Sequence, residues 1–267
     1  MSITNYAESA LIQHLTGEAA YTPAATLYVA LCTADPTDAA TGASCNETAN
    51  AGGYARQAIT FAAASGGSIA QSGQIDFPQA SADYASPITH YCIVDSATYG
   101  AGNALAYGAF SASKTINTNN TPYIADGEIT IDRGGSVSNY LANKLLGLMF
   151  RNTAYTAPSI YVGLATVAVT AGDDGSTITE PSGNGYARTQ ISSWAAESGG
   201  ATSNSAQTDI GPATGSWSTP VSDFLIDSSS GAGNILFFND IAVGDQQAVG
   251  NGDTWRYAAG DYAVSLA

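Results

Sequence analysis

Positively charged residues are the scarcest feature of this chain. Lys and Arg together number 7 among 267 residues, against 22 Asp and Glu, so the formal net charge is −15 at pH 7. Proteins that bind nucleic acid or anionic membranes gather Lys and Arg on one surface, and the sequence contains no such cluster. We therefore expect neither nucleic acid nor a membrane as a partner.

Long hydrophobic runs and a cysteine framework are missing as well. The apolar stretches fall well short of the roughly 20 residues that cross a bilayer, and no basic start followed by an apolar run marks a secretory signal. The three cysteines, Cys32, Cys45 and Cys92, form no Cys-x-x-Cys pair, and their odd number argues against a closed set of disulfides. We expect Cys32 and Cys92 to fill core space as small hydrophobic residues.

Motifs for catalysis, metals and cofactors are equally sparse. The two histidines, His14 and His90, accompany no Gly-x-Ser-x-Gly turn, and we expect His14 on a helix surface or at an interface. No Cys/His cluster has the spacing of a zinc site. The acidic loop 172–176 could offer oxygen ligands to calcium, but it lacks EF-hand spacing, which favours a solvated acidic turn. The sequence thus predicts no enzyme, no metal and no cofactor, including no nucleotide-binding Gly-x-Gly-x-x-Gly.

What the chain does contain is an internal duplication. Several short segments recur in the same order: Asn5-Tyr6 as Asn139-Tyr140, Gly53–Arg56 as Gly185–Arg188, Ser65–Gly67 as Ser198–Gly200, and Gly102-Asn103 as Gly233-Asn234. Ordered self-similarity of this kind indicates a repeated structural unit. We therefore expect two domains, residues 1–134 and 135–267, joined at the flexible Gly-Gly between Arg133 and Ser136.

Each copy opens with a predicted helix. In residues 5–16 apolar positions recur at spacings of three and four, with Asn5 as the expected N-cap, Glu8 completing a capping box and Gly17 ending the helix. The second copy repeats the pattern over 137–150, and Asn152 can adopt the left-handed conformation that stops a helix.

Strand-forming segments follow each helix. They are residues 26–33, 57–62, 88–94, 104–110 and 128–132 in the first copy, and 159–166, 189–194, 221–226, 234–238 and 261–266 in the second. A parallel α/β fold would need helices between successive strands, and the sequence has none there. The predicted fold class is therefore mainly β: two tandem antiparallel β-sandwich, jelly-roll-like domains, each preceded by one N-terminal helix.

The repeated Gly-Tyr-Ala-Arg segment supplies the candidate site. One interpretation makes Tyr54 and Arg56, with Tyr186 and Arg188, a ligand platform for sugars or carboxylates. The interpretation we favour is structural, with each Arg closing a loop by a bidentate bond to a carboxylate or to carbonyls. Asp95 and Asp227 end matching strands, and they are the predicted carboxylate partners.

The first copy resembles a family of small proteins from tailed bacteriophages and prophages, commonly labelled phage tail fibre or virion structural proteins. The segments that carry the resemblance are residues 5–8, 21–38, 52–61, 64–67, 89–95 and 105–110. The second copy keeps the skeleton but departs more, for example at Ser192-Ser193-Trp194. The resemblance implies a virion location after assembly in the host cytoplasm and brings no catalytic residues. Family members usually hold one copy, so the tandem form is a departure that would let a fused pair occupy two quasi-equivalent positions.

Four functions remain open at this point. The first is a non-enzymatic tail or neck fibre or appendage component, acting through contacts with other virion proteins and present as a homo-oligomer or in repeated copies. The second is a capsid decoration, or cement, protein. The third is a module that binds host-surface glycan, and the fourth a glycan-degrading enzyme. The 15 Tyr residues suit an interface, since Tyr gives large contact area with one polar end, but they suit the rim of a β-sandwich equally.

Overall fold

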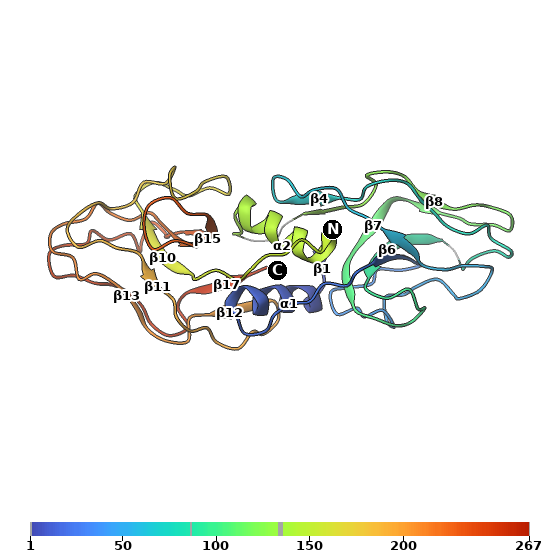
Figure 1. The fold of residues 1–267 in the computed structure, drawn as a ribbon, viewed down its shortest axis with the longest axis horizontal. Coiled ribbons are helices and arrows are strands. Elements are labelled where there is room, and N and C mark those ends of the chain that lie inside the picture. The colour runs from blue at the N-terminus through green and yellow to red at the C-terminus, as the bar shows by residue number, and fades with distance from the viewer. Residues whose placement is uncertain (1, 86, 133–135, 267) are drawn as a thin grey trace.

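The computed structural model describes residues 2–85, 87–132 and 136–266, and it is mainly β. Figure 1 shows two lobes at the ends of an elongated molecule, with both helices in the middle between them. The lobe of repeat 1 (residues 2–132) and that of repeat 2 (residues 136–266) are built from corresponding elements in the same order. The predicted junction falls on residues 133–135, outside the described residues.

Repeat 1 is a larger antiparallel sheet with two short ribbons. The large sheet has the order β1-β7-β6-β2-β3, and the ribbons are β4-β9 and β5-β8. The bounds are β1 Ser2–Ile3, α1 Asn5–Thr16, β2 Leu27–Cys32, β3 Gln57–Ile59, β4 Ser68–Ala70, β5 Ile75–Asp76, β6 Ile88–Val94, β7 Ala104–Lys114, β8 Tyr123–Ile124 and β9 Thr130–Asp132. Each pairing in these sheets is antiparallel.

Repeat 2 reproduces this arrangement, except that its larger sheet has shorter strands and, within the described residues, no strand equivalent to β1. Its larger sheet has the order β11-β10-β14-β15, and its ribbons are β12-β17 and β13-β16, again antiparallel. The bounds are α2 Asn139–Arg151, β10 Tyr161–Ala165, β11 Thr189–Gln190, β12 Ala201–Ser203, β13 Thr208–Ile210, β14 Ser222–Ile226, β15 Ile235–Asp240, β16 Trp255–Tyr257 and β17 Ala263–Ser265. The predicted fold class is confirmed.

The helix ends follow local capping chemistry. Thr4, not Asn5, caps α1, because its side chain accepts a hydrogen bond from the backbone N–H of Ala7, so the predicted Asn5 cap and its capping box with Glu8 are wrong. Ser138 caps α2 in the same way. The predicted stops are confirmed, since Gly17 and Asn152 both adopt the left-handed conformation that ends a helix.

The helices tie the two repeats together. Helix α1 packs on β7 of its own repeat and on β12 of the other, whereas α2 packs on β15 of its own repeat and on β4 of the other. This arrangement is reciprocal, because β4 and β12 are equivalent strands. The surface at which the repeats meet is called the seam below. Buried side chains from both repeats, including Leu11, Ile69, Leu145 and Val264, form one continuous hydrophobic cluster across it.

Candidate functional site

Arg56 lies at the centre of a buried polar cluster in repeat 1. Its side chain has no solvent exposure. Nε and one Nη2 hydrogen donate to the Glu47 carboxylate at 2.9 and 2.7 Å, and the remaining three N–H groups donate to the carbonyl oxygens of Gly42, Ser96 and Ala101, each at 2.8 Å. All five guanidinium donors are thus satisfied. The guanidinium therefore holds two separate loops, one at residue 42 and one at residues 96–101, against the strand edge.

Tyr54 completes this cluster. Its hydroxyl donates to Glu47 Oε1 at 2.7 Å and accepts from the backbone N–H of Leu31 on β2 at 3.0 Å. Burial and the adjacent Glu47 carboxylate raise the pKa of Tyr54 well above its ordinary value. Burial alone would lower the pKa of Arg56, but the hydrogen bonds and charge of Glu47 raise it overall. The cluster therefore keeps a neutral phenol beside a closed ion pair.

Asp95 does not pair with Arg56, so that prediction is wrong. Both Asp95 oxygens accept from Asn103 instead, Oδ1 from the backbone N–H and Oδ2 from the side-chain amide, each at 2.7 Å. A Cβ at Gly102 would lie 2.4 Å from Asp95 Oδ1, so the loop closes around this carboxylate only because residue 102 is glycine. Asp95 shapes the loop whose carbonyls Arg56 then binds.

Repeat 2 has the same cluster with fewer bonds. Tyr186 donates to Glu180 Oε2 at 2.7 Å, and Arg188 binds Glu180 through Nε and Nη2 and the carbonyl of Ser228 through Nη1 at 3.1 Å. Burial first, and then Glu180, raises the pKa of Tyr186. The Asp227 carboxylate accepts hydrogen bonds from the backbone N–H and the side-chain amide of Asn234. The predicted Arg188–Asp227 pair is therefore wrong as well.

The two clusters differ in how well they are sealed. The Glu47 side chain is 5 % exposed, whereas that of Glu180 is 18 % exposed. A crevice of about 250 Å³ adjoins Glu180 and Arg188 in repeat 2. In both repeats, however, the side chains that the repeated motif contributes are engaged by their own loops. This geometry favours the structural interpretation over a ligand platform, which remains a prediction without a test.

Glu47 and Glu180 are the functional residues that the sequence reasoning missed. Each precedes its Arg within the same repeat, and the two occupy equivalent positions in the duplication. The signal was therefore present, because these glutamates recur while most of the few glutamates in the chain do not. The strand-end aspartates recur too, but they accept hydrogen bonds from an asparagine in the turn that follows each strand.

The cysteines of repeat 1 gather in one small core. Cys32, Cys45 and Cys92 are buried and reduced, and they pack together with Ala30, Ala104 and Val94. The prediction that Cys32 and Cys92 fill core space is confirmed. The strand registers make Ala165 and Phe224 their equivalents in repeat 2, where the corresponding core is closed by one large ring.

The other candidate groups have ordinary structural partners. His14 contacts repeat 2 across the seam, where Nε2 lies 2.7 Å from the carbonyl oxygen of Tyr155, which confirms its predicted place at an interface. The carboxylates of the acidic loop 172–176 accept hydrogen bonds from their own loop, as Asp174 does from Ser176. Among the residues that the structure describes, no group of three or more His, Cys, Asp or Glu side chains could hold a metal ion.

A helix long and apolar enough to cross a membrane is also absent from the described part of the chain.

Comparison with known proteins places the chain in a family. The family described as podophage GP4 fiber I protein gp80 matches residues 2–132 and 136–265, which together cover nearly the whole chain. The break between the two matched stretches coincides with the boundary between the repeats. No curated protein matches the chain. The tandem β-rich chain therefore belongs to the family of the podophage GP4 fiber I protein gp80, a family of phage fibre proteins.

Proposed function

We propose that this protein is a non-enzymatic structural component of the tail or neck of a tailed phage, in which it forms part of a fibre or appendage through contacts with other virion proteins. The family match over both repeats carries this proposal. The molecule adds a second argument, because its repeated polar residues are used to close loops. In a structural protein we expect a duplication to retain the hydrogen bonds that hold the loops in place. We do not expect it to retain a reactive group.

Copy number in purified particles tests the placement. Quantitative mass spectrometry of purified virions, referenced to the major capsid and tail proteins, should give a few to a few dozen copies per particle, and gold-labelled antibody should mark the tail. Hundreds of copies with labelling over the shell would instead identify a capsid decoration protein and contradict the tail placement. The non-enzymatic part fails if purified protein releases reducing ends from host polysaccharide.

A second candidate function, glycan binding, is favoured by one groove in repeat 1. The groove has a volume of about 600 Å³, lies over the ends of β7 and β8, and is lined by Tyr123, Asn119, Asn120 and Lys114, among others. Figure 1 places β8 in the outer part of this lobe, away from the seam. Tyr123 is 55 % exposed, so part of its ring is free to contact a ligand in the groove.

The chemistry of this groove suits a saccharide. The Tyr123 ring offers an apolar face with a polar edge, and exposed amides and hydroxyls beside it can bind sugar hydroxyls. Lys114 and Glu128 form an ion pair at 2.9 Å on the groove wall and add charged donors and acceptors. In repeat 2 the equivalent of Tyr123 is Arg256, which is committed to Asp209. Only repeat 1 would then carry this site.

A glycan array with three proteins tests this second candidate. Wild-type protein should bind a subset of saccharides, Tyr123→Ala should lose at least tenfold in affinity, and Tyr99→Ala should bind as the wild type does. Tyr99 is the matched control because it is also exposed, at 41 %, but lies outside the groove. Absence of wild-type binding, or equal loss in both variants, would eliminate glycan binding in this groove.

A further inference from the structure

The seam is built from equivalent contacts made in both directions. Asn143 on α2 accepts a hydrogen bond through Oδ1 from the backbone N–H of Gly67, at 3.0 Å. Ser9 occupies the equivalent position on α1, and its hydroxyl donates to Glu197 Oε1 at 2.8 Å, which in turn accepts from the N–H of Gly200 at 2.7 Å. Gly67 and Gly200 are equivalent glycines. Each helix therefore uses one position to hold the same loop of the other repeat.

Close packing accompanies these hydrogen bonds. Gly200 has φ +76°, and a Cβ built there would lie 2.8 Å from Cβ of Glu8 on α1. On the other side of the seam, the ring centroids of Phe61 from repeat 1 and Phe150 from α2 lie 5.2 Å apart. These are contacts of a protein interior rather than of two domains that touch loosely.

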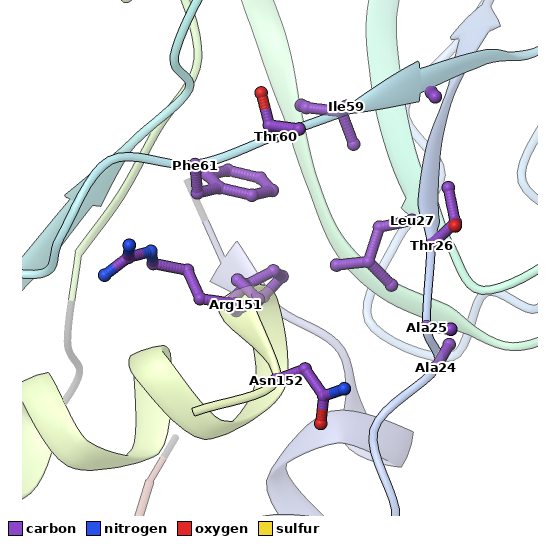
Figure 2. A pocket seen from close by; sticks show the side chains of 11 residues that line it. Ala24, Ala25, Thr26, Leu27, Ile59, Thr60, Phe61, Arg151 and Asn152 are labelled. Carbon is purple, nitrogen blue, oxygen red and sulfur yellow. The ribbon is translucent and has the colours of Figure 1, made fainter. Parts of the chain in front are cut away.

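Two corresponding crevices flank the seam. One, of about 290 Å³, lies between the β2–β3 edge of repeat 1 and the end of α2, and Figure 2 shows Phe61 and Leu27 on one side of it with Arg151 and Asn152 on the other. The second, of about 440 Å³, lies between the end of α1 and the segment around Trp194, which is the equivalent of Phe61. Crevices as well as contacts therefore occur in equivalent pairs at the seam, as expected when a pseudo-two-fold axis relates the two repeats.

The covalent junction also has an equivalent. Strand β9 ends repeat 1 at Asp132, which pairs with Ser68, and β17 reaches Ser265, which pairs with Ala201 in the corresponding ribbon. Asp132 is thus equivalent to Ser265, and Ser136 is equivalent to Ser2. The link from Asp132 to Ser136 therefore corresponds to a possible link from Ser265 to Ser2. The chain from Asp132 to Ser136 spans at most about 14 Å when fully extended. Under the pseudo-symmetry, a linker of the same length should be able to join Ser265 to Ser2.

We propose that the seam is a self-association surface whose partner is a second copy of the same repeat, and that this chain is a dimer of repeats joined at one of two equivalent junctions. The isologous pattern is the argument, since the same positions on each repeat meet the same positions on the other. The covalent link then raises the local concentration of the partner. The order of the repeats along the chain is accordingly interchangeable.

Cutting the junction tests the first half of this proposal. A protease site placed at residues 133–135 of the full chain allows cleavage after folding. The two halves should remain associated during gel filtration and native mass spectrometry at micromolar concentration. Separation of the halves under these conditions would overturn the proposal, whether or not each half remained folded.

A pair of glycine variants shows whether the seam itself holds the cut halves. Gly200→Ala and Gly199→Ala introduce the same methyl group at left-handed positions, φ +76° and +62°, but only Gly200 faces Glu8, while the space around Gly199 is open. In the cut protein, Gly200→Ala should weaken association at least tenfold more than Gly199→Ala does. Equal effects would show that α1 does not bind repeat 2 through this contact.

A circular permutant tests the second half. The chain is opened between Asp132 and Ser136. The buried Leu266 is kept and joined to Ser2 through Gly-Gly, so that three residues separate Ser265 from Ser2, as three separate Asp132 from Ser136. This permutant should show the circular dichroism spectrum of the parent and a melting temperature within a few degrees of it. If the permutant fails to fold, the two junctions are not equivalent and that half of the proposal is refuted, independently of the result with the cut chain.

Discussion

Loss of the Arg56 guanidinium should destabilise the protein more than loss of its counterpart Arg188. In Arg56→Met the Glu47 carboxylate, 5 % exposed, would lose its cationic partner and retain only the Tyr54 hydroxyl as a donor, and the carbonyls that Arg56 binds would lose their donors. Removing one member of a buried ion pair costs about 3–5 kcal/mol. We expect Arg56→Met to lie in that range.

The counterpart in repeat 2 should cost less for a geometric reason. Glu180 is 18 % exposed beside an open crevice, so water can solvate its carboxylate once the guanidinium is gone, and Arg188 releases a single carbonyl, that of Ser228. Hydrogen bonds to charged groups contribute about 1.5–3 kcal/mol. Arg188→Met should therefore cost about 2–3 kcal/mol.

Calorimetry and urea unfolding of the intact chain measure both variants, with the double variant Arg56→Met/Glu47→Leu as the control. Removing both partners leaves no unpaired charge, so the double variant should recover part of the loss. At about 2–4 °C per kcal/mol for a chain of this size, Arg56→Met should lower Tm by roughly 6–20 °C. A destabilisation below about 1 kcal/mol, or one equal to that of Arg188→Met, would refute the conclusion that this cluster stabilises the fold by holding the loops.

Further predictions concern burial and charge. Burial, and then the charges of Asp38 and Glu197, raise the pKa of Glu8, so the folded state binds the proton more tightly than the unfolded state. The free energy of unfolding should therefore fall as pH rises from the unfolded pKa of about 4.3 through the folded pKa. In urea titrations, Glu8→Gln should flatten this pH dependence and be more stable than wild type at pH 7–8. Gly163→Ala should cost about 1–3 kcal/mol, because a Cβ there would lie 2.4 Å from the Phe224 ring, and the cost should shrink in a Phe224→Cys background. The three buried thiols should react with Ellman's reagent only after unfolding, and rapid labelling of the native protein would contradict their burial.

Local patterns in the sequence predicted most of the regular structure. Both helices, their glycine and asparagine stops and strands such as Ile88–Val94 follow from apolar spacing and turn chemistry within a few residues. In the ribbons of repeat 1, β9 falls within the predicted segment 128–132. Strands β4, β5 and β8 were not predicted, because two or three residues carry too short a pattern to detect. The N-cap of α1 was misplaced because Thr4 and Asn5 are both good capping residues, and only the backbone angles decide between them.

The candidate site was predicted in part. The repeated Tyr and Arg marked the correct place, but their acidic partner was misassigned, since a carboxylate that lies eight or nine residues away on a loop cannot be distinguished by type from one at a strand end. The seam could not be predicted from the sequence. Ser9 and Asn143 look like ordinary exposed helix positions, and only the fold shows that both reach the opposite repeat.

Reciprocal docking of the two helices has an arithmetical consequence for chains of this type. In a pair of repeats, each helix docks on the ribbon of the other repeat. A chain with an even number of repeats can therefore pair all of them within one polypeptide. A third repeat appended to this chain would present an unmatched helix and an unmatched ribbon, and it could cover them only by recruiting a repeat from another molecule. Odd-numbered chains should therefore cross-link, whereas even-numbered chains should remain self-contained.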